Sequence, residues 1–176
     1  MHDIKAKRCA GALREVKRVY TTAFPREERL PFFVLRLMTL FGAKITAYYE
    51  GDVFCGFTHT TIKKDIVFVM FFAVQDGLRQ KGYGSAILSY LKAEHPGKTV
   101  VLNVEPLDDD APNANERVCR MRFYAKNGFH DTGYLVDEVG GTFCVLSTSP
   151  ILDTKTYLGV FKKLSLGLWR PKITKA

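Results

Sequence analysis

Two glycines and two cationic residues are gathered in residues 79–84, which read Arg-Gln-Lys-Gly-Tyr-Gly. The apolar run 66–74 precedes this stretch, and a segment with helical spacing, Ser85 to Glu94, follows it. A loop that leaves a strand and opens a helix collects unpaired backbone N–H groups, and the helix dipole adds partial positive charge there. Such loops bind anions, above all phosphate, and glycines let the backbone approach the phosphate oxygens. The stretch therefore predicts a phosphate site, with an ordinary tight turn as the alternative.

The spacing of the loop excludes two familiar phosphate-binding motifs. The sequence contains no G-x-x-x-x-G-K-[ST] stretch, which a P-loop requires. Ile87 stands where a dinucleotide-binding fingerprint needs its third glycine.

What the stretch does resemble is the acetyl-CoA loop of the GNAT N-acetyltransferase superfamily, [Q/R]-x-x-G-x-[G/A]. Arg79, Gly82 and Gly84 fill its fixed positions. Further along, residues 123–129 read Phe-Tyr-Ala-Lys-Asn-Gly-Phe, which is similar to the family's second signature, Y-x-K-x-G-F. Because both signatures occur in the family's order and at its separation, the resemblance is specific over residues 66–134.

The resemblance implies an α+β fold, with a mixed, mostly antiparallel central sheet, flanking helices and splayed central strands. It implies acetyl-CoA as co-substrate and no metal. The backbone of the loop would hold the pyrophosphate, and the end of the preceding strand would pair with the pantetheine arm. The cofactor-binding residues implied in this way are Phe72, Ala73, Val74, Arg79, Gln80, Lys81, Gly82, Tyr83, Gly84 and Ser85.

In such enzymes a neutral amine attacks the thioester directly, which calls for a base at the amine and an acid at the leaving thiolate. Tyr124 occupies the family's tyrosine position and is the candidate acid; a purely structural buried aromatic is the alternative. Glu105 ends the apolar segment 99–104, where the splay would open, and is the candidate base, either directly or through a water. A solvated carboxylate at a strand end is the alternative for Glu105.

The chain departs from the second signature at Arg117, where the family often has an asparagine. Asn113 and Asn115 lie close by, and Asn115 is the candidate for the missing cofactor contact. Glu27 and Glu28 fall between the first two expected helices, a region that commonly lines the acceptor side in this superfamily. They are candidates for binding a cationic amine, with complementation of a helix dipole as the alternative.

Hydrophobic periodicity and turn residues divide the chain into alternating elements that would form one mixed sheet. Two tight turns predict an antiparallel meander, and the strand–helix–strand unit that follows predicts a parallel crossover. We expect one domain over 1–176, with a C-terminal helix near 151–168 and a tail, 169–176, that is free to fray. The expected helices are 7–23, 32–41, 82–94 and 115–126, and the expected strands are 44–50, 53–62, 66–74, 99–104, 130–136 and 142–147.

The charge and composition of the chain restrict the kind of protein it can be and the compartment in which we expect it. The chain has 176 residues and a formal net charge of +8, and its charges are spread thinly rather than in one run. The four cysteines are scattered without metal-binding or disulfide spacing, and no apolar segment is long enough to span a membrane. The N-terminus lacks the apolar core of a signal peptide, so we expect a cytoplasmic protein.

The sequence thus favours an acyltransferase that moves an acetyl group from acetyl-CoA to a primary amine of a small molecule or peptide. One alternative is a GNAT-like regulator that binds CoA without catalysis. A second is a basic nucleic-acid-binding domain, although no recognition motif for nucleic acid is present. Neither a nucleic acid nor a membrane is expected as a partner, and a homodimer is left open.

Overall fold

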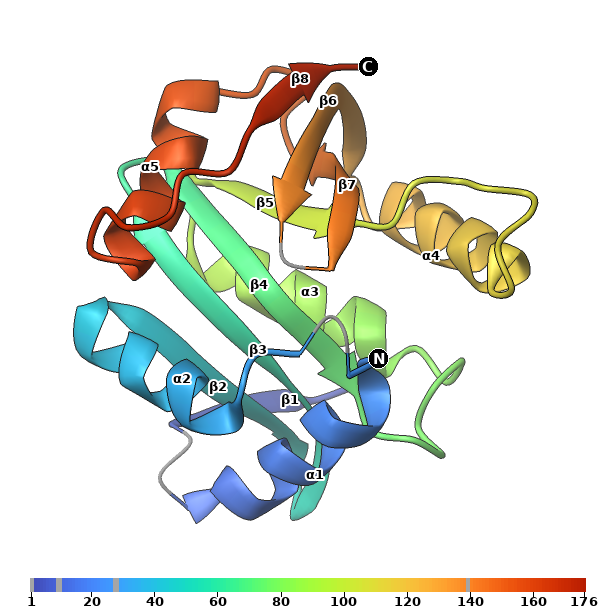
Figure 1. Cartoon of the computed structure of the whole chain (residues 1–176). Helices are drawn as coiled ribbons and strands as arrows, with labels where there is room; N and C mark the ends of the chain where they lie inside the picture. The colour runs from blue at the N-terminus through green and yellow to red at the C-terminus, as the bar shows by residue number, and fades with distance from the viewer. Residues whose placement is uncertain (1, 9–10, 27–28, 139) are drawn as a thin grey trace.

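The computed structural model describes residues 2–8, 11–26, 29–138 and 140–176. The elements in these ranges follow the order that the sequence predicts, with one further strand at each end (Figure 1). They are β1 (Ile4–Arg8), α1 (Leu13–Ala23), α2 (Phe32–Met38), the short 3-10 helix η2 (Thr39–Phe41), β2 (Ala43–Glu50), β3 (Val53–Lys63), β4 (Ile66–Val74), α3 (Tyr83–Glu94), β5 (Thr99–Val104), α4 (Ala114–Lys126), β6 (His130–Glu138), β7 (Gly141–Ser147), α5 (Thr154–Leu164) and β8 (Ile173–Lys175).

The strands form one mixed sheet in the order β1-β2-β3-β4-β5-β7-β6-β8. Its one parallel pair is β4 with β5, and the other described pairs are antiparallel. The helix α3 makes the crossover between the two parallel strands, as an unbroken β-α-β unit requires. The predicted fold class, a mostly antiparallel α+β sheet with flanking helices, is confirmed.

The two parallel strands separate along their length. Their pairing runs from Ile66 with Thr99 to Val69 with Leu102, although both strands continue beyond it. On the other side of β4 the register with β3 shifts at the same level, so that Met70 is an extra, bulged residue. Bulges bend a strand and increase its twist. The edge of β4 that follows Met70 is thereby turned away from β5, which produces the expected splay.

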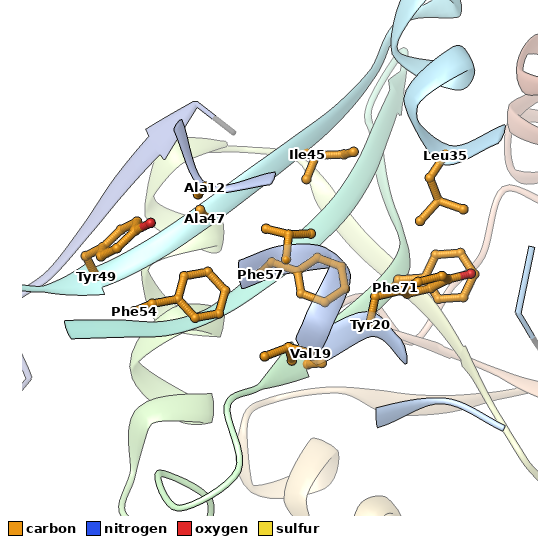
Figure 2. Packing of buried hydrophobic residues seen from close by; sticks show 12 residues of the cluster. Ala12, Val19, Tyr20, Leu35, Ile45, Ala47, Tyr49, Phe54, Phe57 and Phe71 are labelled. Carbon is orange, nitrogen blue, oxygen red and sulfur yellow. The ribbon is translucent and has the colours of Figure 1, made fainter. Parts of the chain in front are cut away.

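Helices cover both faces of the sheet, and the bulge changes which helices β4 contacts. Val67 and Val69 pack under α3 and α4, and Phe68 packs under α5. Beyond the bulge the alternation reverses, so Phe71 and Ala73 pack under α1 and α2. Figure 2 shows the resulting cluster, in which Tyr20 of α1 meets Phe71 edge-to-face at 5.0 Å between ring centroids.

The N-terminus differs from the sequence-based expectation of a helix from Lys7. Residues Ile4–Arg8 are a strand that pairs with β2, and the helix α1 begins only at Leu13. Ile4 is buried in a cluster with Tyr48 and Ile87, so long-range packing decides the conformation here against local helical spacing.

The C-terminus is more ordered than the sequence suggests. The helix α5 is shorter than expected because Asp153 caps its start, where it accepts a bond from the Thr156 backbone N–H. The residues after Trp169 include the strand β8, which pairs with β6, and Trp169 packs edge-to-face on Phe161. The apolar side of α5 is buried against the sheet of its own chain. No helix in the described ranges has the length and apolarity needed to cross a bilayer.

Candidate functional site

The splay between β4 and β5 opens into a cavity of about 790 Å³. Its walls come from segments far apart in the sequence: the α1–α2 region, β4, the loop before α3, the end of β5, α4, the β6–β7 hairpin and the C-terminal segment. The residues that line it include Met38, Met70, Phe72, Ala73, Val74, Arg79, Gln80, Gly82, Gly84, Ser85, Asn103, Glu105, Asn113, Arg120, Tyr124, Glu138, Phe143 and Trp169.

One end of the cavity is the glycine loop, drawn in green between β4 and α3 in Figure 1. Gly82 caps α3 with a left-handed backbone (φ 87°), and among the described residues no side chain forms a capping hydrogen bond at this helix start. The Ala86 N–H is bonded to the Gly82 carbonyl at 3.1 Å. The N–H groups of Tyr83, Gly84 and Ser85 precede that bond and have no partner within the helix. This helix start therefore offers an anion three backbone donors together with the positive end of the helix dipole.

The two glycines have different roles. Gly82 has a positive φ, which a side chain would strain. A β-carbon at Gly84 would lie only 3.0 Å from the ring of Phe123, so this glycine lets α3 and α4 pack closely. The second glycine of the motif is thus explained by packing of the cavity wall as well as by access to the loop.

Lys81 and Tyr83 lie on the far side of the loop from the cavity, and neither side chain lines it. The ring of His2 stacks on Tyr83 at 3.9 Å, and its Nε2 bonds to the Lys81 carbonyl at 2.7 Å. The Tyr83 hydroxyl donates to Glu50 at 2.6 Å. These contacts tie the back of the loop to β1 and β2, so that Lys81 and Tyr83 face the cavity at most through their backbone. Arg79 lines the cavity and is paired with Asp76 at 2.9 Å.

Tyr124 lies in the cavity wall on α4, and its side chain is buried between Phe123 and Phe129. Burial raises the pKa of its hydroxyl to about 12, although the charge of Arg120 acts in the opposite direction. The hydroxyl therefore keeps its proton at neutral pH. A buried, protonated phenol in a cavity can serve as a proton donor.

Glu105 lies at the end of β5 and is held by α4. Arg117 approaches the Oε1 atom of Glu105 at 3.0 Å, and the Asn113 amide donates to the same oxygen at 3.1 Å. Arg120 approaches the other oxygen, Oε2, at 2.5 Å. Burial on its own would raise the pKa of this carboxyl, but the bonds from Asn113 and Arg120 and the charges of both arginines outweigh it and lower the pKa. The carboxylate is thus charged, fully engaged and only 13% exposed.

Glu138, at the end of β6, is a carboxyl that the sequence analysis did not single out. Asn103 of β5 donates a hydrogen bond to it, and the Tyr157 hydroxyl of α5 donates to Asn103 at 2.9 Å. Burial raises the pKa of Glu138 to about 7, and the bond from Asn103 offsets this only in part. The strand pattern does contain one indication of this inward position. Glu138 shares a strand face with Val136, which is fully buried, so the alternation along β6 turns the Glu138 side chain inward.

Three predicted site residues remain, namely Asn115, Glu27 and Glu28. Asn115 is exposed and lies outside the cavity lining, whereas Asn113 lines it. Glu27 and Glu28 fall outside the described residues, although Pro25 and Leu30 on either side of them line the cavity. Within the described part of the chain, no group of histidine, cysteine and acidic side chains is arranged to hold a metal ion.

No family model matches this sequence, and no curated protein sequence matches it. Solved structures do match. A protein from Bacteroides thetaiotaomicron assigned to the GNAT acetyltransferases aligns with 94% of this chain and 99% of its own, at 20% identity and a TM-score of 0.73.

Two further solved structures align as well. The ribosomal-protein-S18-alanine N-acetyltransferase of Escherichia coli covers 84% of this chain and 92% of its own, at 17% identity and a TM-score of 0.62. Arabidopsis thaliana Naa50, solved with the bisubstrate analogue CoA-Ac-MVNAL, covers 83% and 98%, at 18% identity and a TM-score of 0.60. At these identities the likeness concerns the fold alone. The chain has the fold of the GNAT N-acetyltransferases.

Proposed function

We propose that this protein transfers an acetyl group from acetyl-CoA to a primary amine. The observation that carries the proposal is a convergence in one cavity: the free amides at the start of α3, the unpaired edge of β4 and the buried hydroxyl of Tyr124 all border it. A regulator that only bound CoA would need the first two features. It would have no use for a protonated phenol in the wall beside them.

The chain's own residues fit acetyl-CoA. The amides of Tyr83, Gly84 and Ser85 suit a pyrophosphate, and Arg79 adds a positive charge at the rim of the cavity. The edge of β4 over Phe72–Val74, which β5 leaves unpaired, suits an extended amide-containing arm that pairs like an added strand. When bound, acetyl-CoA supplies the activated acetyl thioester.

Tyr124 is positioned to protonate the leaving sulfur, because its hydroxyl keeps its proton at neutral pH. The assignment of Glu105 as the base stays a prediction. Its carboxylate is charged, as a base must be, but a proton placed on it would disrupt two ion pairs with Arg117 and Arg120. Glu105 is at least the group that fixes α4, and with it Tyr124, against the end of β5.

The acceptor enters, in this proposal, at the end of the cavity bordered by Met38, Met70, Phe143 and Trp169, which we call the acceptor end. These side chains are apolar and pack in one cluster under α5. They suit an amine attached to an apolar group, such as the N-terminus of a peptide with an apolar first residue. Two structural neighbours support an amine acceptor in general: one was solved with a CoA–peptide analogue and another is an aminoglycoside 6'-N-acetyltransferase solved with coenzyme A.

The proposal is tested by following thiol release from acetyl-CoA across a panel of peptides, polyamines, aminoglycosides and simple alkylamines, with mass spectrometry of the products. We expect amine-dependent release that matches the amount of acetylated amine, and the fastest release with peptides that begin with an apolar residue. Tight binding of acetyl-CoA without release for any amine would favour the regulator instead.

A further inference from the structure

Glu138 is the carboxyl at the acceptor end of the cavity. It borders the same cavity as Met70, Phe143 and Trp169, and it is bonded to Asn103. Asn103 directly follows Leu102, the last residue of β5 that pairs with β4. The bond from Asn103 therefore fixes the Glu138 carboxyl beside the point where the strands part.

Glu138 is only partly exposed, and its hydrogen-bonded neighbours among the described residues are an amide and, behind that amide, a phenol. The polar groups that face it are Asn103 from β5 and, behind it, Tyr157 from α5. Among the described residues no cation forms an ion pair with it, and Asp137, next in the chain, points to the other face of β6 and bonds to Thr142. Burying a carboxyl with one amide partner is costly, and such groups are concentrated at functional sites.

Glu138 and Glu105 are therefore two carboxyls on one cavity with opposite electrostatic environments. The pKa of Glu105 is lowered, whereas burial raises the pKa of Glu138 to about 7. Proton transfer is most effective when the pKa of the base lies near the working pH. Of the two, Glu138 is the one that can both take up and release a proton near neutrality.

We propose that Glu138 is the base that takes a proton from the acceptor amine at the acceptor end of the cavity, with Asn103 as its positioning residue. This inference rests on the acetyltransfer proposed above and names a residue for it. Tyr157 stabilises the arrangement through its bond to the Asn103 side-chain oxygen, which fixes the orientation of the amide whose N–H₂ group faces Glu138.

An acceptor that arrives as an ammonium ion gives one proton to the Glu138 carboxylate, and the nitrogen lone pair then forms a bond to the thioester carbonyl carbon. The carbon–sulfur bond breaks, its electron pair stays on sulfur, and sulfur takes the proton of Tyr124. The new amide nitrogen loses its second proton to solvent, Glu138 releases its proton and Tyr124 regains one. The products are one acetamide, one CoA thiol and one proton.

The test compares Glu138→Gln with Glu105→Gln and with Asp137→Asn, a control on the same strand whose side chain faces away from the cavity. We expect Glu138→Gln to lower kcat/KM for an alkylamine by about 100-fold or more, the usual effect of losing a general base, with acetyl-CoA affinity unchanged. The acidic limb of the wild-type pH–rate profile, with an apparent pKa near 7, disappears in this variant and remains in the other two.

A merely structural role for Glu138 would not depend on the basicity of the acceptor. An arylamine is already neutral at pH 7, so the loss in Glu138→Gln should be far smaller for an arylamine than for an alkylamine. Equal losses of kcat/KM for the alkylamine and the arylamine would overturn the assignment. So would disappearance of the acidic limb from the pH–rate profile of Glu105→Gln.

The assignment also has a test that needs no acceptor. Carbon-13 NMR titration of the glutamate carboxyls in the wild type, assigned with Glu138→Gln, should show Glu138 titrating near pH 7. Titration below pH 5 would overturn the inference while leaving the proposed acetyltransfer intact. A wild-type protein that binds no acetyl-CoA would instead overturn the proposed function itself, whatever the titration shows.

Discussion

At the scale of single residues, the site shows how one residue type acquires two roles from its surroundings. Glu105 and Glu138 border the same cavity, but Glu105 meets two arginines and Glu138 meets one amide. Arginine partners favour the charged form of a carboxyl, and burial favours its neutral form. The chemistry of each residue therefore depends on contacts that only the folded chain provides.

Tyr124→Phe tests the proton donor. Because the hydroxyl is buried and protonated, removing it should lower kcat by about 100-fold while the Kd for acetyl-CoA changes less than about twofold. Steady-state kinetics and calorimetric titration measure the two quantities. An unchanged kcat with intact binding would show that Tyr124 is a packing residue between Phe123 and Phe129.

Glu138 also has a consequence for stability. The pKa of Glu138 is raised in the folded protein from 4.5 to about 7, so the folded state binds its proton more tightly than the unfolded state. The free energy of unfolding should therefore fall as the pH rises between about 4.5 and 8, by up to about 3.4 kcal/mol from this residue.

In Glu138→Gln this contribution is absent, so urea unfolding across that pH range should show a flatter profile and a more stable protein at pH 8. Asp137→Asn serves as the matched variant and should follow the wild type. A wild-type free energy of unfolding that rises or stays level across this pH range would show that folding does not raise the pKa of Glu138.

At the scale of elements, α4 is held to the sheet by one polar cluster at the end of β5. Arg117 and Glu105 are 16% and 13% exposed, so this pair within the cluster is largely shielded from water and from salt. The same helix carries Tyr124, and Phe123 on it packs against Gly84 of α3. The two walls of the cavity are thereby fixed relative to each other.

Glu105→Ala should lower the free energy of unfolding by about 2 kcal/mol, because it removes the carboxylate that Arg117 and Arg120 share as an ion-pair partner. The pKa of Glu105 is lowered by folding, so its stabilisation is present above pH 4.5 and is lost as the pH falls through the folded-state pKa. The difference between variant and wild type should therefore shrink in acid.

The control is Glu94→Ala, which removes a more exposed ion pair with Lys44 and should cost less than about 1 kcal/mol. Chemical denaturation at pH 7 and at pH 3 measures all three proteins. Equal losses in the two variants would show that the cluster at β5 contributes no more than a surface pair.

At the scale of the whole molecule, local signals predicted the meander, the crossover and the glycine loop. Each of them depends on residues adjacent in the sequence, such as Gly82 and Gly84 at the start of α3. The strands β1 and β8 were missed because their conformations come from pairing with β2 and β6, far away in the chain. The bulge at Met70 was missed for the same reason, since a bulge exists only relative to a partner strand.

The residues of the candidate site also divide into those that a local motif predicts and those that only long-range contacts bring into place. The place of the glycine loop before α3 and the place of Tyr124 in the cavity wall could be predicted, because each belongs to a short motif. Glu138 could not be placed in the site, because it reaches the cavity only when the β6–β7 hairpin packs beside β5 and brings it to Asn103. Where several distant elements meet, sequence spacing carries little information.

The proposed acetyl transfer requires above all that the start of α3 binds the pyrophosphate of acetyl-CoA. Calorimetric titration of acetyl-CoA into the wild type, Gly82→Val and Gly77→Val tests it directly. Both glycines have a positive φ, 87° and 73°, so both substitutions should cost a similar amount of stability, about 1–2 kcal/mol. Gly77 lies outside the cavity lining, and a β-carbon there would have no atom within 4 Å.

We expect Gly82→Val to weaken acetyl-CoA binding by about tenfold or more and Gly77→Val to leave it unchanged, since losing even one charge-assisted hydrogen bond costs that much. Equal affinities in all three proteins would contradict the account and leave the loop as an ordinary turn.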